Sequence, residues 1–128
     1  MIETMKYKDI TAKIIGCAMQ VHCTMGNGFQ EAIYQRALAI EMSLVGLAFE
    51  REKEMDIFYK GEHIGTRRAD FFVEECIMVE LKALIKLEDV HLAQAMNYSE
   101  AYHMEIGFLI NFGGKSPEFK QVHNNKIM

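Results

Sequence analysis

The chain has 128 residues, 50% of them hydrophobic, and a formal net charge of −4 at pH 7. We expect one domain with one core over residues 1–128, because this length leaves no room for a second domain. The acidic balance argues against a basic tail or stripe of the kind that binds nucleic acid non-specifically. It is compatible with a local basic patch made of Arg67, Arg68, Lys82, Lys86 and Lys115.

Cysteine content and hydropathy indicate the compartment. Cys17, Cys23 and Cys76 are odd in number and lack CxxC spacing, so the sequence predicts neither a disulfide framework nor a zinc site. Reduced thiols are typical of cytoplasmic proteins. No uncharged stretch approaches the roughly 18 residues that a membrane span needs. We therefore expect a soluble cytoplasmic protein that does not enter a membrane.

Apolar spacing and glycine positions predict two helices in the first part of the chain. The first begins at Asp9 and runs to about Cys23. Its apolar face consists of Ile10, Ile14, Ala18 and Val21. Glycines at 26 and 28 break this pattern, and a second helix is expected over residues 29–45, ended by Gly46. Glu31 lies in its first turn, where the helix dipole already explains a carboxylate.

The middle of the chain is rich in β-branched and aromatic residues. Residues 49–59 predict a strand, and a turn leads from it into residues 63–68. Residues 67–73 and 77–83 predict a hairpin whose turn is the polar segment 74–76. Three or four consecutive antiparallel strands are therefore expected.

This hairpin places three charged side chains together. Strand residues alternate between faces, so Glu80 and Lys82 point the same way. With a three-residue turn, Val73 pairs with Ile77, and Asp70 lies opposite Glu80 with Cβ atoms roughly 5 Å apart. The predicted result is a pair of carboxylates with a lysine beside it.

Two facing carboxylates in an apolar hairpin are costly unless a cation lies between them. Mg²⁺ binds one or two carboxylates with waters and phosphate oxygens, and it lowers the pKa of an attacking water. Lys82 could orient that water or neutralise charge on a phosphoryl group. The competing interpretation is a solvated sheet face on which Glu80 and Lys82 are surface charges, and the hairpin alone does not decide between the two.

A third helix and two strands are expected in the last part of the chain. The helix covers about residues 88–103. Its polar, hydrogen-bonding stripe consists of His91, Gln94 and Tyr98. A strongly apolar strand follows over residues 105–112, and residues 119–123 predict a short edge strand.

Five motifs follow one another along the chain. They are Gly28-Phe29-Gln30-Glu31-Ala32-Ile33-Tyr34, Arg68-Ala69-Asp70, Glu80-Leu81-Lys82, His91-x-x-Gln94-x-x-x-Tyr98 and Leu109-Ile110-Asn111-Phe112-Gly113. Their order and spacing resemble the GxxExxY protein family, which is classed in the PD-(D/E)XK nuclease superfamily. The resemblance covers about residues 9–114, nearly the whole chain. Ala69 departs from the proline that commonly precedes the aspartate.

The resemblance implies an α/β, restriction-endonuclease-like fold: a mixed sheet that carries the hairpin and is flanked by helices. It implies that Asp70 and Glu80 bind Mg²⁺ or Mn²⁺, that Lys82 is the motif lysine, and that Glu31 completes the metal site. Gln94 and Tyr98 resemble the QxxxY motif of RecB-like nucleases, which is associated with DNA contact.

The favoured function is hydrolysis of phosphodiester bonds in DNA, or possibly RNA, with Asp70, Glu80, Lys82 and Glu31 as the catalytic set. The expected substrate contacts are Gln94, Tyr98, Tyr34, His91 and Arg68. For the two tyrosines, packing with a satisfied hydroxyl competes with this role. The alternative function is a non-catalytic, nucleic-acid- or protein-binding regulatory module on a nuclease fold, which the acidic balance and small size favour. A homodimer or a protein partner is compatible with either.

Overall fold

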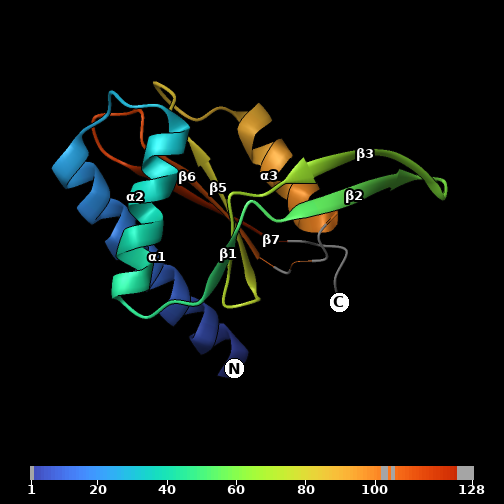
Figure 1. Ribbon diagram of the computed structural model, residues 1–128, viewed down its shortest axis with the longest axis horizontal. Helices are drawn as coiled ribbons and strands as arrows, with labels where there is room; N and C mark the ends of the chain where they lie inside the picture. The colour runs from blue at the N-terminus through green and yellow to red at the C-terminus, as the bar shows by residue number, and fades with distance from the viewer. Residues whose placement is uncertain (1, 102–103, 105, 124–128) are drawn as a thin grey trace.

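The structure of the protein is a computed structural model in which residues 2–101, 104 and 106–123 are described (Figure 1). Side chains are described for these residues except 2–6, 98 and 101. In chain order the elements are α1 (Ile2–Met25), α2 (Glu31–Leu44), β1 (Phe49–Arg51), β2 (Glu54–Tyr59), β3 (Glu62–Arg68), β4 (Phe71–Val73), β5 (Ile77–Lys82), α3 (Asp89–Ala101), β6 (Ile106–Asn111) and β7 (Glu118–His123).

Five of the strands form one mixed sheet in the order β1-β4-β5-β6-β7, with β5 in the centre. Only the β5–β6 pair is parallel, and α3 provides the crossover between these two strands. The helices α1 and α2 pack on one face of the sheet, and α3 packs on the other (Figure 1). The predicted α/β class, a mixed sheet flanked by helices, is therefore confirmed.

The main core lies between the sheet and the first two helices. The predicted apolar face of α1 is confirmed, since Ile10, Ile14, Ala18 and Val21 are all buried. The sheet meets this face with alternate residues of β5, which are Ile77, Val79 and Leu81. Because the other residues of β5 point to the opposite face, Glu80 and Lys82 lie away from this core. The apolar alternation of β5 therefore sets the direction of the charged pair.

The predicted strands 49–59 and 67–73 are each split in two, which is a correction. The first divides at Glu52 and Lys53, where Glu52 has a left-handed backbone with φ of 53°. The second divides at Ala69 and Asp70, and the two breaks are tied because the Glu52 N–H donates to the Asp70 carbonyl oxygen at 3.1 Å. The inner halves β1 and β4 join the main sheet, while the outer halves pair only with each other. The predicted consecutive antiparallel strands are present, since β1 pairs with β4, β2 with β3 and β4 with β5, all antiparallel, but they divide between two sheets.

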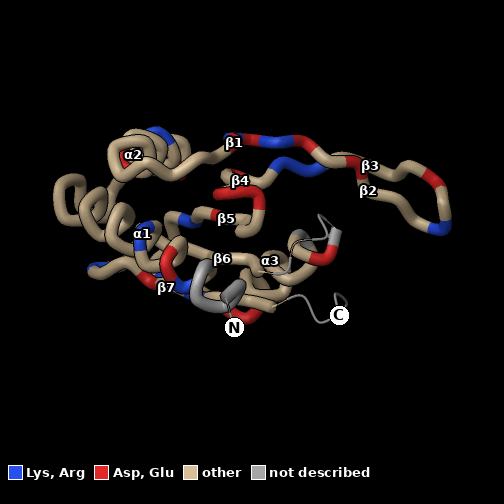
Figure 2. Tube along the Cα trace, turned by 90° about the horizontal axis from the view of Figure 1, so that it is seen from below, with Lys and Arg blue, Asp and Glu red and all other residues tan. Residues whose placement is uncertain are grey.

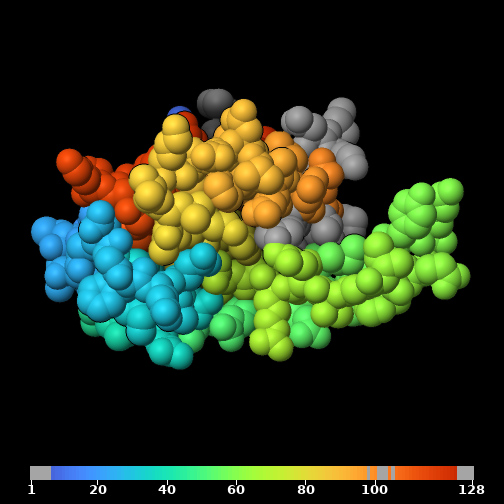
Figure 3. Space-filling model, turned by 90° about the horizontal axis from the view of Figure 1, so that it is seen from above, coloured from blue at the N-terminus to red at the C-terminus, as the bar shows by residue number. Residues whose placement is uncertain are grey.

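The outer halves form a two-stranded ribbon, the β2–β3 ribbon, that projects from the body of the molecule (Figures 1 and 3). It carries residues of both charge signs, and acidic and basic residues are also interspersed over the rest of the described trace (Figure 2). The large apolar side chains that it exposes are Phe58, Tyr59 and Ile64.

The helix boundaries differ from the prediction mainly at α1. This helix begins at Ile2, so Asp9 lies inside it and does not cap it. Near Asp9, inside this helix, the Thr11 side-chain hydroxyl donates to the Tyr7 carbonyl oxygen one turn earlier, at 3.0 Å. The predicted end of α3 at about residue 103 lies outside the described residues, and the described helix ends at Ala101. Within the described residues, none of the three helices combines the length and the apolar run needed to cross a membrane.

The contact between α3 and β6 depends on a glycine, which provides a test of the packing. A Cβ at Gly107 would overlap the Ser99 hydroxyl of α3 and come within 2.9 Å of Val122. We expect Gly107→Ala to lower the free energy of unfolding by about 1–3 kcal/mol, because the close-packed helix must move. Urea unfolding measures this change.

The matched control is Gly16→Ala on α1, where an added Cβ meets nothing within 4 Å. It should raise the stability by about 0.5–1 kcal/mol, since alanine is the better helix former. Equal effects of the two substitutions would contradict this account of the α3 packing.

Candidate active site

Asp70 and Glu80 lie together at the carboxyl end of the central strand. The register of β4 and β5 pairs Val73 with Ile77, as predicted for a three-residue turn. Asp70 directly precedes β4 and therefore faces Glu80 of β5. The Asp70 N–H donates to Glu80 Oε1 at 3.2 Å. The predicted proximity of the two carboxylates is confirmed.

Both oxygens of the Asp70 carboxylate accept hydrogen bonds. The Leu81 N–H donates to Oδ2 at 2.8 Å, and Gln35 Nε2 donates to Oδ1 at 2.8 Å. Gln35 is itself held by Arg51, whose Nη2 donates to Gln35 Oε1 at 3.3 Å. These bonds fix the orientation of the Asp70 carboxylate.

Neither Gln35 nor Arg51 was predicted from the sequence. For Gln35 a signal existed, because it lies four residues after Glu31 and so shares that face of α2. For Arg51 no local pattern pointed to the site, since its place depends on the pairing of β1 with β4.

Burial works against the negative charge of both carboxyl groups. The pKa of Glu80 is raised to about 8, first because burial removes water from the carboxylate and then because Asp70 carries the same charge. The Asp70 N–H, Lys82 and Arg67 oppose this rise. Burial also raises the pKa of Asp70, against the hydrogen bonds from Leu81 and Gln35. Burial and mutual repulsion therefore both favour the protonated form of the pair.

Lys82 and Glu31 complete the charged cluster. The charge of Lys82 lowers the pKa of Asp70, of Glu80 and of Glu31, so its ammonium lies within electrostatic reach of all three. The pKa of Glu31 is raised by partial desolvation, and Asp70 raises it further, although Glu31 is exposed on α2. The structure thus brings Glu31 to the cluster from the helix that was predicted to carry it.

The donor set fits a hard divalent cation, which takes oxygen ligands and tolerates one or two carboxylates with waters. Asp70 and Glu80 supply two carboxylates whose mutual repulsion a cation would relieve. Across the described residues, no three His, Cys, Asp or Glu side chains lie close enough together to hold a metal as they stand. Glu31 is therefore near the pair without being assembled with it as a third ligand.

Tyr34 packs in the core with its hydroxyl hydrogen-bonded, which is the interpretation that competed with a role in substrate contact. Its side chain is fully buried, its ring stacks on Phe112 with centroids 4.6 Å apart, and its hydroxyl donates to the Gly26 carbonyl oxygen at 2.6 Å. The same hydroxyl accepts from the Phe29 N–H at 3.2 Å. Tyr34 therefore holds the loop that precedes α2, and with it the start of the helix that presents Glu31.

The other predicted substrate contacts lie on α3 and on the ribbon. His91 Nδ1 accepts from the Glu88 N–H at 2.9 Å, and Gln94 Oε1 is buried with no hydrogen-bond partner in the described part of the chain. Tyr98 is on the same helix, and its side chain is outside the described set. Arg68 is exposed and bonds to Glu54 at 3.3 Å, whereas it is Arg67 whose charge acts on Glu80.

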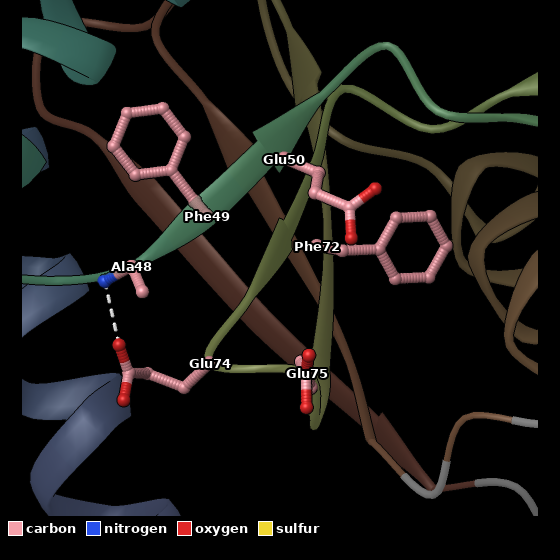
Figure 4. A pocket seen from close by; sticks show the side chains of 6 residues that line it. All are labelled: Ala48, Phe49, Glu50, Phe72, Glu74 and Glu75. Atoms are coloured by element: carbon pink, nitrogen blue, oxygen red, sulfur yellow. Dashed lines mark hydrogen bonds between the residues drawn. The ribbon is translucent and has the colours of Figure 1, made fainter.

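Two concavities lie at opposite ends of the β4–β5 hairpin. One of about 610 Å³ follows Lys82 along the chain and is lined by Ala83, Leu84, Ile85, Lys86, Glu88 and His91. The other, of about 370 Å³, lies at the turn end and is lined by Ala48, Phe49, Glu50, Phe72, Glu74 and Glu75 (Figure 4). In it Glu74 accepts from the Ala48 N–H. Neither lining includes Asp70, Glu80, Lys82 or Glu31, and the first begins at Ala83, the residue that follows Lys82.

The family model of the PD-(D/E)XK nuclease superfamily matches residues 8–122. The chain belongs to this superfamily. Nucleases of the superfamily generally use divalent metals, which agrees with the oxygen-rich, electrostatically strained pair of Asp70 and Glu80. The superfamily and the mixed sheet together confirm the restriction-endonuclease-like fold.

Among solved structures, this chain is similar to the crystal structure of SSO0001, with a TM-score of 0.58 and 19% sequence identity. The alignment covers 72% of this chain and 48% of SSO0001, so the chain spans about half the length of that protein. At this identity the likeness shows the fold alone. The comparison with curated proteins found no match.

The raised pKa of Glu80 predicts how the stability of the metal-free protein depends on pH. The folded state binds the Glu80 proton more tightly than the unfolded chain, whose group titrates near 4.5. The stabilisation is therefore fully present below about pH 4.5 and is lost as pH rises through about 8. Glu80→Gln should abolish this loss, which we expect to be roughly 1–5 kcal/mol.

Urea unfolding in a chelator at several pH values measures this dependence. Glu62→Gln, on the exposed ribbon, is the control and should leave the pH slope as in the wild type. The same slope in Glu80→Gln and wild type would rule out Glu80 as the group responsible.

The hydrogen bonds of Asp70 predict different effects for two substitutions. Asp70→Ala leaves the Leu81 N–H and Gln35 Nε2 without their acceptor, which should lower the stability of the metal-free protein by about 1–3 kcal/mol. Asp70→Asn retains one acceptor oxygen and removes the repulsion with Glu80, so its stability should stay within about 1 kcal/mol of wild type. Equal loss in both variants would show that the charge of Asp70 itself supports the fold.

Proposed function

We propose that this protein is a metal-dependent nuclease that hydrolyses phosphodiester bonds in DNA, with RNA as a second candidate substrate. The observation that carries the proposal is the buried contact between Asp70 and Glu80, with the pKa of Glu80 raised to about 8, in a chain of a nuclease superfamily. Such crowding of like charges is common at functional sites and is unfavourable in a purely structural role. The five sequence motifs support a place for the protein in the GxxExxY family.

Asp70 and Glu80 are the residues we propose to hold Mg²⁺ or Mn²⁺, with Glu31 as a further ligand from α2. When bound, the ion supplies Lewis acidity and a water of lowered pKa. Gln35 and the Leu81 N–H keep the Asp70 carboxylate oriented for this task. Loss of the proton held by Glu80 would accompany metal binding, because a ligating carboxylate must be ionised.

Lys82 is the residue we propose to act on the nucleophile. Its ammonium lies within electrostatic reach of the carboxylates and can donate to an attacking water or to a phosphoryl oxygen. Arg67 adds a second positive charge on the side of Glu80. These two cations offset the charge of a phosphodiester, which the net charge of −4 would otherwise repel.

The nucleic acid is proposed to run along the concavity that follows Lys82. His91 lines it, and Gln94 and Tyr98 follow His91 on α3. The buried Gln94 Oε1 supports a role in binding, because an acceptor without a partner in the described residues can accept from a ligand or a water. Arg68, exposed on the ribbon, is proposed to contact the strand farther from the scissile bond. We propose a cytoplasmic location, which the odd number of cysteines and their lack of CxxC spacing support.

Cleavage of single-stranded DNA, duplex DNA and RNA with Mg²⁺ or Mn²⁺ tests the proposal. We expect Lys82→Ala to keep its metal affinity, measured by calorimetry, and to lose turnover by roughly 10²-fold or more. Lys82→Arg should not restore full activity, because a planar guanidinium does not place its donors as a compact ammonium does. Glu80→Ala should lose both metal binding and cleavage.

The control is Lys120→Ala, an exposed lysine on the edge strand β7, which should cleave as the wild type does. Absence of cleavage of all three substrates by the wild type would favour the non-catalytic binding module. Unchanged cleavage in both Lys82→Ala and Glu80→Ala would do the same.

A further inference from the structure

Asn111 ends β6 and is fully buried, with its amide hydrogen-bonded on both sides. Its Oδ1 accepts from the Leu84 N–H at 2.8 Å and from the Gly113 N–H at 3.1 Å. Its Nδ2 donates to the Leu84 carbonyl oxygen at 3.0 Å and to Glu118 Oε1 at 2.7 Å. Asn111 therefore bonds to both backbone groups of Leu84 at once.

This arrangement holds the point where the chain leaves the sheet after Lys82. In the parallel register, Lys82 of β5 pairs with Asn111 of β6, and the Phe112 N–H donates to the Lys82 carbonyl oxygen at 2.8 Å. Leu84 lies two residues beyond Lys82, past the end of β5, where the Asn111 amide binds its backbone in place of a neighbouring strand. The chain is thus held at the Lys82 carbonyl group by Phe112 and again at Leu84 by Asn111.

Gly113 and Glu118 add to the contact between Asn111 and the backbone of Leu84. A Cβ at Gly113 would overlap the backbone of Leu84 and lie 2.6 Å from the Ala83 carbonyl carbon, so only glycine allows this approach. Glu118 Oε1 accepts from Asn111 and also from the Leu87 N–H at 3.3 Å. The segment after Lys82 is therefore held at Leu84 and again at Leu87.

We infer that Asn111 is a positioning residue that directs the Lys82 side chain toward Asp70 and Glu80 by fixing the backbone at Leu84, just after that lysine. The amide suits the task because it offers an acceptor and a donor side by side, matching the N–H and carbonyl of one peptide residue. An aspartate of the same shape would place an acceptor against the Leu84 carbonyl oxygen and the Glu118 carboxylate. The inference rests on the proposed nuclease function for its catalytic consequence.

Three variants disturb the contact in different ways. Asn111→Asp keeps the shape and removes both donated hydrogen bonds, Asn111→Ala removes all of them, and Gly113→Ala displaces Leu84 without altering Asn111. If Asn111→Ala does not fold, the other two carry the test. Gln20→Glu is the control, an exposed amide-to-acid change on α1.

The first measurement is amide hydrogen exchange at Leu84 and Phe112 in the full chain, which requires neither metal nor turnover. We expect exchange at these two amides to be roughly 10-fold faster or more in Asn111→Asp and Gly113→Ala than in wild type, and unchanged in Gln20→Glu. Unchanged exchange at both amides in the folded variants would overturn the inference.

The second measurement is a double-mutant cycle on cleavage, with metal affinity recorded by Mg²⁺ calorimetry. Asn111→Asp should lower kcat by roughly 10- to 100-fold with metal affinity unchanged, because misplacing a catalytic group mainly affects turnover. In the Lys82→Ala background it should cause no further loss. An equal loss in both backgrounds would show a general structural role and would overturn the inference.

The two measurements separate this inference from the proposed function. If the wild type cleaves none of the nucleic acids while exchange at Leu84 and Phe112 responds as expected, the nuclease proposal fails and Asn111 still holds the Lys82 end of β5. If the wild type cleaves and exchange does not respond, the nuclease proposal stands and the role of Asn111 is refuted.

Discussion

The burial of two like-charged carboxyl groups at the end of β5 is the constraint on which the site depends. A hydrophobic sheet excludes water from Glu80, and Asp70 lies opposite it, so the pair is unstable as two free anions. The surrounding residues offset part of the cost of burying this pair. Leu81 and Gln35 satisfy one carboxylate, while Lys82 brings a positive charge near both. These contacts offset part of the cost of burying two carboxyl groups side by side.

Residues around this pair also hold neighbouring segments of the chain in place. Tyr34 stacks on Phe112 and holds the loop ahead of α2, which presents Glu31. Asn111, the neighbour of Phe112, holds the chain just beyond Lys82. Residues at the end of β6 therefore contact both Tyr34 of α2 and Leu84, which lies just after β5.

The β2–β3 ribbon arises from the same region. Paired breaks at Glu52 and at Asp70 turn the outer strands away from the sheet. Asp70 lies at the second break, where the register of β4 and β5 places it opposite Glu80. The projecting ribbon therefore begins beside the carboxylate pair, and the charge of Arg67 on this ribbon acts on Glu80.

Sequence alone determined the features that depend on local periodicity. Alternation along β5 predicted which residues enter the core, and the three-residue turn predicted the register that brings Asp70 to Glu80. Only the tertiary structure decided the contacts that join distant segments: Gln35 on Asp70, Arg51 on Gln35, the burial of Tyr34 and the split of the long strands. The spacing of apolar residues along one helix or strand indicates which of its faces is buried. The contacts between distant segments depend instead on how separate helices and strands pack against one another, which no single segment determines.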